Sequence, residues 1–163
     1  MNLAPLLASA SQTHMVQVVL PNDANPLGFI LGGTVMHLID MAGAIASVRH
    51  ARSRVVTAAV DGLEFLHPIK VGDLIILDAR VTGTFHTSLE VRVEVFSEKV
   101  LSGERQLTSH AYLTFVAIGE DGTPVPVPPL LLETDDDRRI ADAAHARRAG
   151  RLAVREADGR RAR

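Results

Sequence analysis

The longest apolar stretch of the chain runs from Thr34 to Val48, where nearly every position is Val, Met, Leu, Ile or Ala. A helix that is apolar on all sides is expected inside a protein or a membrane, and about 15 residues are too few to span a bilayer. Within this stretch His37, Asp40 and Ser47 fall three and seven positions apart, which puts them on one stripe. The pattern therefore predicts a buried helix that carries an unusual mid-helix carboxylate.

The other apolar positions alternate with polar ones and predict strands. The cleanest alternation places Leu and Val on one face of residues 88–95 and Ser88, Glu90, Arg92 and Glu94 on the other, so we expect that polar face to be wet. Pro, Gly and Asn-Asp turn signals separate the apolar runs. We expect five strands, over residues 13–20, 54–66, 74–82, 88–95 and 104–118.

One apolar helix and five strands joined by short turns predict an α+β fold in which an antiparallel sheet curls around the helix. A single five-stranded sheet cannot enclose a helix that is apolar on all sides, so a second copy of the protein should close the remaining face. The Pro-rich run 124–129 should leave the domain in an extended form, and residues 136–155 should form an Arg- and Ala-rich helix.

The chain has 163 residues and 47% hydrophobic residues, enough for one domain with a core. Low aromatic content, 4% without Trp, argues against base stacking as an activity. The absence of Cys excludes disulfides and thiolate metal sites and suits a reducing cytoplasm. We expect a disordered start over residues 1–12, no leader peptide, no membrane span and a cytoplasmic location.

Charge is unevenly distributed along the chain. Residues 1–137 hold 8 Lys and Arg against 16 Asp and Glu, whereas residues 138–163 hold 9 Arg against 3 acidic residues. A basic tail can meet nucleic acid, a membrane or an acidic neighbour. We favour a helix that packs on the acidic body of its own oligomer.

Three features of the region before and within the apolar helix are candidates for chemistry. Asp40 needs a partner, a wet cavity or a catalytic task, because an isolated buried charge is costly; a satisfied structural carboxylate is the alternative. Gly32 and Gly33 stand at the helix start, where free N–H groups can bind an oxyanion, although a glycine pair can also be a plain turn. Asn25 offers an amide, or forms an Asx turn before Pro26.

These residues belong to an ordered series of motifs. The series comprises N-P-L-G-F-I-L-G-G at 25–33, Asp40 with Ala42-Gly43, Arg49-His50, V-V-T-A-A-V-D at 55–61 with Phe65 and Pro68, V-G-D at 71–73, T-S-L-E-V at 87–91, D-G-T-P-V-P-V-P at 121–128 and the Arg-rich tail. Over residues 16–151 the chain resembles the hotdog-fold acyl-CoA thioesterases of the brain acyl-CoA hydrolase type and their single-domain bacterial relatives. The resemblance implies a thioesterase domain over 13–130, an Arg-rich helix and tail over 131–163, and homodimers that assemble into a hexamer, a trimer of dimers.

By resemblance, the activity is hydrolysis of an acyl-CoA to a free acid and CoA, with no metal and no cofactor beyond the CoA of the substrate. Asn25 and Asp40 stand where the family has its catalytic Asn and Asp. The residues fit that chemistry, because Asp40 can activate a water while the Gly32 and Gly33 N–H groups receive the oxyanion. Attack by Asp40 itself, through an anhydride, is an alternative. Phe29 and Leu31 depart from the family pattern and leave chain-length preference open.

Cations and hydroxyl groups should hold the phosphates of CoA. We expect Arg52 or Arg54 to do so and do not choose between them. The candidate substrate and CoA contacts are Arg49, His50, Arg52, Arg54, Thr57, Thr87 and Ser88.

Two other functions are compatible with parts of the sequence. The stretch D-A-N-P-L-G at 23–28 resembles a hydratase signature that requires His where this chain has Gly28. A non-enzymatic acyl-CoA-binding regulator would need a DNA-binding helical region, for which the 12 residues before the first strand are too few. We therefore expect no nucleic-acid partner.

The spacing within the helix makes a geometric prediction. Asp40 lies seven residues beyond Gly33, which separates it from the first N–H groups of the helix by ~10 Å. One thioester carbon cannot lie within ~3 Å of both groups. If both serve one reaction, they come from two protomers, with Asn25 and the glycine loop of one chain facing Asp40 of the other.

Overall fold

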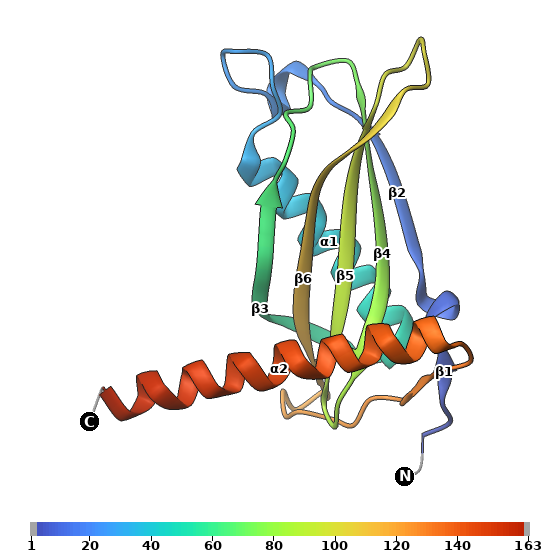
Figure 1. The fold of residues 1–163 in the computed structure, drawn as a ribbon, viewed down its shortest axis with the longest axis vertical. Coiled ribbons are helices and arrows are strands. Elements are labelled where there is room, and N and C mark those ends of the chain that lie inside the picture. Colours follow the sequence, from blue (N-terminus) through green and yellow to red (C-terminus); the bar gives the residue numbers. More distant parts are fainter. Residues whose placement is uncertain (1–2, 162–163) are drawn as a thin grey trace.

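A computed structural model describes residues 3–161, and its centre is one antiparallel sheet of five strands in the order β2-β4-β5-β6-β3 (Figure 1). The strands match the five expected from the alternation, although β5 runs three residues further than predicted. Their bounds are β2 (Thr13–Val18), β3 (Arg54–Phe65), β4 (Leu74–Thr84), β5 (Ser88–Glu98) and β6 (Arg105–Ile118).

Helix α1 (Gly32–Ala51) packs along one face of this sheet and confirms the predicted apolar helix. Its buried side includes Leu38, Ile39 and Ala42. At Gly43 an added Cβ would lie 3.0 Å from the ring of Phe115 on β6, so the missing side chain permits close approach of helix and sheet. The residues of the predicted polar stripe differ in exposure along the helix: Ser47 is fully buried, whereas His37 is exposed.

Helix α2 (Asp135–Arg161) crosses the opposite face of the sheet and then projects beyond the edge strand β3 (Figure 1). The contact is close at Gly83, where an added Cβ would lie 2.8 Å from the Cβ of Ala144. Our prediction of a wet face on β5 was wrong at Glu90, which is 0% exposed beneath α2. Alternation within one strand does not reveal that a helix beginning 45 positions after Glu90 will cover it.

The predicted disorder of residues 1–12 also needs correction where the chain is described. β1 (Leu6–Leu7) pairs in parallel with β7 (Leu130–Leu131), and the 3-10 helix η1 (Ala8–Ser11) buries Ala8 and Ser11. A second 3-10 turn, η2 (Pro21–Asp23), follows β2. The pairing partner of β1 is distant in the sequence, so no local pattern announces it. Residues 1 and 2 lie outside the described part.

One side of α1 stays uncovered by its own chain. Met36, Met41 and Ile45 on the helix and Val56 and Val60 on β3 are all exposed. A continuous apolar surface beside an unpaired strand edge is typical of an interface. None of the helices within residues 3–161 is long and apolar enough to cross a membrane.

Candidate active site

Asn25 builds the loop that leads into α1. Its side-chain Oδ1 accepts hydrogen bonds from the backbone N–H of Leu27 at 3.0 Å and of Phe29 at 3.2 Å. Gly28 completes this turn with a φ of 80°, a conformation that favours glycine. The Asx-turn interpretation is thus correct for the carbonyl of Asn25, and two N–H contacts identify that atom as oxygen. The side-chain NH₂ is left to donate to another group.

The start of α1 presents free N–H groups. Leu31 is the N-cap and supplies no side-chain cap. Gly32 and Gly33 are exposed, and, apart from its chain neighbours and the adjoining backbone of α1, no atom of residues 3–161 lies within 4 Å of a Cβ placed on Gly33. A substrate oxygen can therefore approach the first turn, where the helix dipole favours negative charge.

Asp40 lies in the middle of α1, half-buried, and its partner is a threonine of the neighbouring edge strand. The hydroxyl of Thr57 on β3 donates to Asp40 Oδ1 at 2.7 Å. Thr57 was among the residues predicted to contact substrate, but its bond to Asp40 was not foreseen, because the two are 17 positions apart on different elements. The sequence signal that could have indicated this bond was a threonine on a strand predicted to flank the helix.

The two halves of the candidate site lie apart within one chain. Gly32 packs near the ring of Phe65, with an added Cβ 3.5 Å from Cζ, whereas Asp40 is bonded to Thr57. Phe65 and Thr57 are eight positions apart on β3, which is roughly 20 Å or more along an extended strand. The glycine loop and Asp40 thus lie beside different positions along β3.

An apolar cavity of about 290 Å³ opens beside Asn25. Phe29, Ile30 and Val35 line it from the loop and helix, and Phe65 lines it from the end of β3. Phe29 is one of the residues that depart from the family pattern, and its place here supports a part in shaping an apolar pocket.

Two of the residues predicted to contact CoA, Arg49 and His50, contact other parts of their own chain instead. His50 is 0% exposed, with Nε2 3.1 Å from the carbonyl oxygen of Pro128, and burial lowers its pKa. A buried, neutral His50 cannot meet a phosphate, so the structure contradicts that assignment. Arg49 donates to the carbonyl of Gln12 at 2.9 Å and to Thr13 at 3.1 Å, which fastens the N-terminal segment to α1.

The remaining predicted phosphate ligands lie at one end of the sheet. Arg52, which ends α1 with a φ of 52°, and Arg54 are exposed beside an open hollow of about 640 Å³. The sheet register puts Ser88 opposite Val116 on β6, whose other neighbour is Val56 on β3. Thr87 precedes Ser88 in the same turn, so these hydroxyls and guanidinium groups share one end of the molecule.

Comparison with known proteins identifies the family. Residues 27–104 match the model of the thioesterase superfamily. An uncharacterized acyl-CoA thioester hydrolase of Bacillus subtilis is 39% identical over 126 residues, which cover 77% of this chain and 73% of that protein. The chain belongs to the thioesterase superfamily. The cytosolic acyl coenzyme A thioester hydrolase of Rattus norvegicus is 35% identical over 85% of this chain, but the chain spans only 37% of that relative's length.

Solved thioesterase structures share the whole fold. A hexameric acyl-CoA thioesterase without ligand superposes with a TM-score of 0.88 at 41% identity and covers 92% of this chain and 96% of its own. An acyl-CoA hydrolase of Staphylococcus aureus, with an Asn replaced by Ala and coenzyme A bound, gives a TM-score of 0.90 at 34% identity over 97% of this chain and 95% of its own. Two further structures of that hydrolase replace an Asp and a Thr by Ala. The architecture is the expected hotdog fold with the expected C-terminal helix, α2.

Proposed function

We propose that this protein hydrolyses an acyl-CoA thioester to a free carboxylic acid and CoA. The observation that carries the proposal is the set of Asn25, Asp40 and Thr57, of which the last two are joined at 2.7 Å. The three residues replaced in the Staphylococcus aureus hydrolase are also Asn, Asp and Thr, separated by the same 15 and 17 positions. The same residue types at the same intervals support equivalent roles here.

Each group has a defined task in this proposal. Asp40 accepts the proton of the attacking water while Thr57 holds one carboxylate oxygen in place. The N–H groups of Gly32 and Gly33 and the NH₂ of Asn25 donate to the oxygen that becomes negative in the tetrahedral intermediate. CoA leaves as a thiolate, a good leaving group, so the reaction needs no strong acid and no cofactor.

The separation of the two halves supports a site shared between two protomers. β3 is an edge strand with an unpaired side, and apolar residues of α1 and β3 are exposed next to it. Antiparallel pairing of two β3 edges about a two-fold axis would bring the Phe65 end of one strand toward Thr57 of the other. The glycine loop of one chain would then face Asp40 of the other.

The substrate would lie across this interface. The cavity beside Phe29 and Asn25 suits the apolar acyl chain, and Arg52 or Arg54 with Thr87 and Ser88 would hold CoA phosphates. A homodimer, assembled into a hexamer as in the hexameric neighbour, would carry the sites. A cytoplasmic location remains part of the proposal and is supported by the name of the rat relative.

A thiol-release assay tests the function directly. The purified protein is mixed with palmitoyl-CoA and a thiol reagent, and we expect steady release of CoA that scales with protein concentration. Shorter acyl-CoA substrates are assayed in parallel, because chain length is not settled by the fold. Saturable acyl-CoA binding without release of CoA from any of them would identify a binding protein and overturn the proposal.

A further inference from the structure

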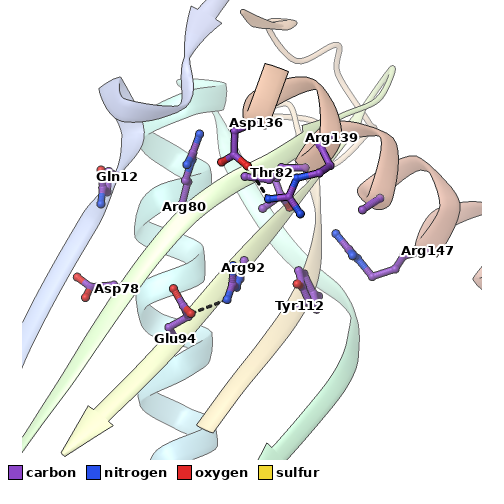
Figure 2. A pocket seen from close by; sticks show the side chains of 12 residues that line it. Gln12, Asp78, Arg80, Thr82, Arg92, Glu94, Tyr112, Asp136, Arg139 and Arg147 are labelled. Carbon is purple, nitrogen blue, oxygen red and sulfur yellow. Dashed lines mark hydrogen bonds and ion pairs between the residues drawn. The ribbon is translucent and has the colours of Figure 1, made fainter. Parts of the chain in front are cut away.

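A second cavity lies on the face of the sheet opposite to α1. It measures about 410 Å³ and is bounded by β4, β5 and β6 below and by the first half of α2 above (Figure 2). We call it the outer-face cavity. Because the sheet separates it from Asp40 and Thr57, the proposed hydrolysis makes no use of it.

Three arginine side chains converge on the outer-face cavity. Figure 2 shows the guanidinium groups of Arg92 from β5 and of Arg139 and Arg147 from α2 pointing toward the space around Tyr112. The guanidinium carbon of Arg147 lies 3.8 Å from the centre of the Tyr112 ring. Each of the three arginines has a carboxylate partner, and Asp78, Glu94 and Asp136 line the cavity beside them, so the positive charge is largely offset and the unused N–H groups are what a ligand would meet.

The carboxylates that accompany these arginines leave many donors unused. Arg92 binds Glu94 at 2.5 Å and Arg139 binds Asp136 at 2.5 Å, each through a single nitrogen. Arg147 binds Glu90 through Nε and Nη2. A guanidinium has five N–H donors, so within residues 3–161 most of the donors around this cavity have no protein acceptor.

A fourth arginine strengthens the case. Arg80 on β4 stands directly opposite Arg92 on β5, and each is held by one carboxylate, Asp137 for Arg80 and Glu94 for Arg92. The Nε atoms of both residues are buried without a partner among the described residues. A ligand with several acceptor oxygens would accept hydrogen bonds from the N–H groups that these carboxylates leave unused.

We propose that the outer-face cavity binds a phosphate group, carried by inorganic phosphate or by a small phosphomonoester. A phosphate has several acceptor oxygens and a double negative charge, and guanidinium groups from several directions match its geometry. The cavity walls leave room for a small organic group beside the phosphate.

Calorimetric titration of the full-length protein with inorganic phosphate and with glycerol phosphate, at constant ionic strength, tests this assignment. R92Q and R139Q should each weaken binding roughly tenfold, because each removes a charge-assisted hydrogen bond to the ligand. R138Q is the matched control: Arg138 precedes Arg139 on α2 and pairs with Asp135 as Arg139 pairs with Asp136, but it does not line the cavity. Its affinity for phosphate should equal that of the parent.

Two results would overturn the proposal. One is that neither probe binds at 10 mM, on the order of the weakest useful affinity. The other is that R138Q and R139Q lose phosphate affinity equally. Arg139 is 78% exposed, so R139Q decides the matter even if R92Q does not fold. CoA is titrated as well, since it carries phosphates. Unchanged CoA binding by R139Q separates the cavity from the substrate site, whereas a loss equal to that for phosphate assigns the cavity to substrate and refutes a separate site.

Discussion

Asp40 is a half-buried carboxylate whose two oxygens have different surroundings. Thr57 is hydrogen bonded to Oδ1, and no other residue of the described chain is bonded to either oxygen. One oxygen is thus fixed while the other can accept a proton from water. A fixed carboxylate at the uncovered side of a helix is better suited to catalysis than to packing, where both oxygens would be satisfied.

Replacing Asp40 tests this role. Asp40→Asn keeps the shape of the side chain and its bond to Thr57 but cannot take a proton, so kcat should fall by about 100- to 10,000-fold with little change in thermal stability. Thr57→Val should lose less, roughly tenfold, because it removes only the bond that orients the carboxylate. Both are measured by CoA release and thermal unfolding. If Asp40→Asn releases CoA at the rate of the parent protein, Asp40 is a structural residue.

Asn25 offers a way to separate loop formation from catalysis. Asn25→Asp retains an oxygen for the N–H groups of Leu27 and Phe29 but loses the NH₂ donor. We expect unchanged thermal stability and a fall in kcat of about 100-fold, the loss typical of one oxyanion donor. Asn25→Ala, which removes the turn as well, should lower both. If Asn25→Asp keeps full activity, the residue serves only the turn.

At the scale of the elements, local pattern predicted the strands and α1, whereas contacts between elements escaped it. The alternation of β5 was clear, yet it placed Glu90 in solvent. In the structure Glu90 lies beneath α2 and binds Arg147, 57 positions later, and Thr82 on β4. The basic composition of residues 138–163 predicted a helix on an acidic body, but not which carboxylates it would meet.

The buried ion pair makes α2 part of the folded domain, and Arg147→Ala tests that. The substitution leaves the Glu90 carboxylate buried with Thr82 as its remaining partner, so the free energy of unfolding should fall by about 3 kcal/mol. Arg138→Ala, which breaks an exposed pair on the same helix, should cost at most about 0.5 kcal/mol. Urea unfolding measures both. Equal small losses would show that α2 rests on the sheet without stabilising it.

His50 links the end of α1 to the Pro-rich segment and should make stability depend on pH. Burial lowers the pKa of His50 in the folded state below its ordinary value of 6.5. The unfolded chain therefore binds a proton more readily, and stability should be full above neutral pH and fall as pH drops below 6.5. His50→Gln, which can still donate to Pro128, should lose less stability between pH 7.5 and pH 5. Identical losses in both proteins would contradict this account.

At the scale of the whole molecule, the apolar character of α1 predicted that one chain is not a complete unit. The single chain leaves Met36, Met41 and Ile45 exposed on the side away from its sheet. Gly32 lies beside Phe65 and Asp40 beside Thr57, so the two groups contact different parts of β3, as two positions on one helix should. How two copies pair could not be predicted, because it depends on surfaces assembled from distant parts of the chain.

Complementation between two inactive variants tests whether the site is shared. Asn25→Asp and Asp40→Asn are unfolded together in equal amounts and refolded, so that random pairing makes half of the dimers mixed. In a shared-site dimer, one of the two sites then combines the intact Asn25 and glycine loop of the Asp40→Asn chain with the intact Asp40 of the other. About a quarter of wild-type activity should return.

The separately refolded variants, assayed at the same total concentration, give the baseline for this recovery. Subunit mixing is established with an affinity tag on one variant, which must co-purify the untagged chain. A site built within a single chain pairs each intact residue with a damaged one in every protomer, so it regains nothing however well the subunits mix. Mixed dimers without recovered CoA release would therefore place Asn25 and Asp40 in the site of the same protomer. The loop and α1 would then have to move toward each other by several ångströms during catalysis, because ~10 Å of helix otherwise separates the groups.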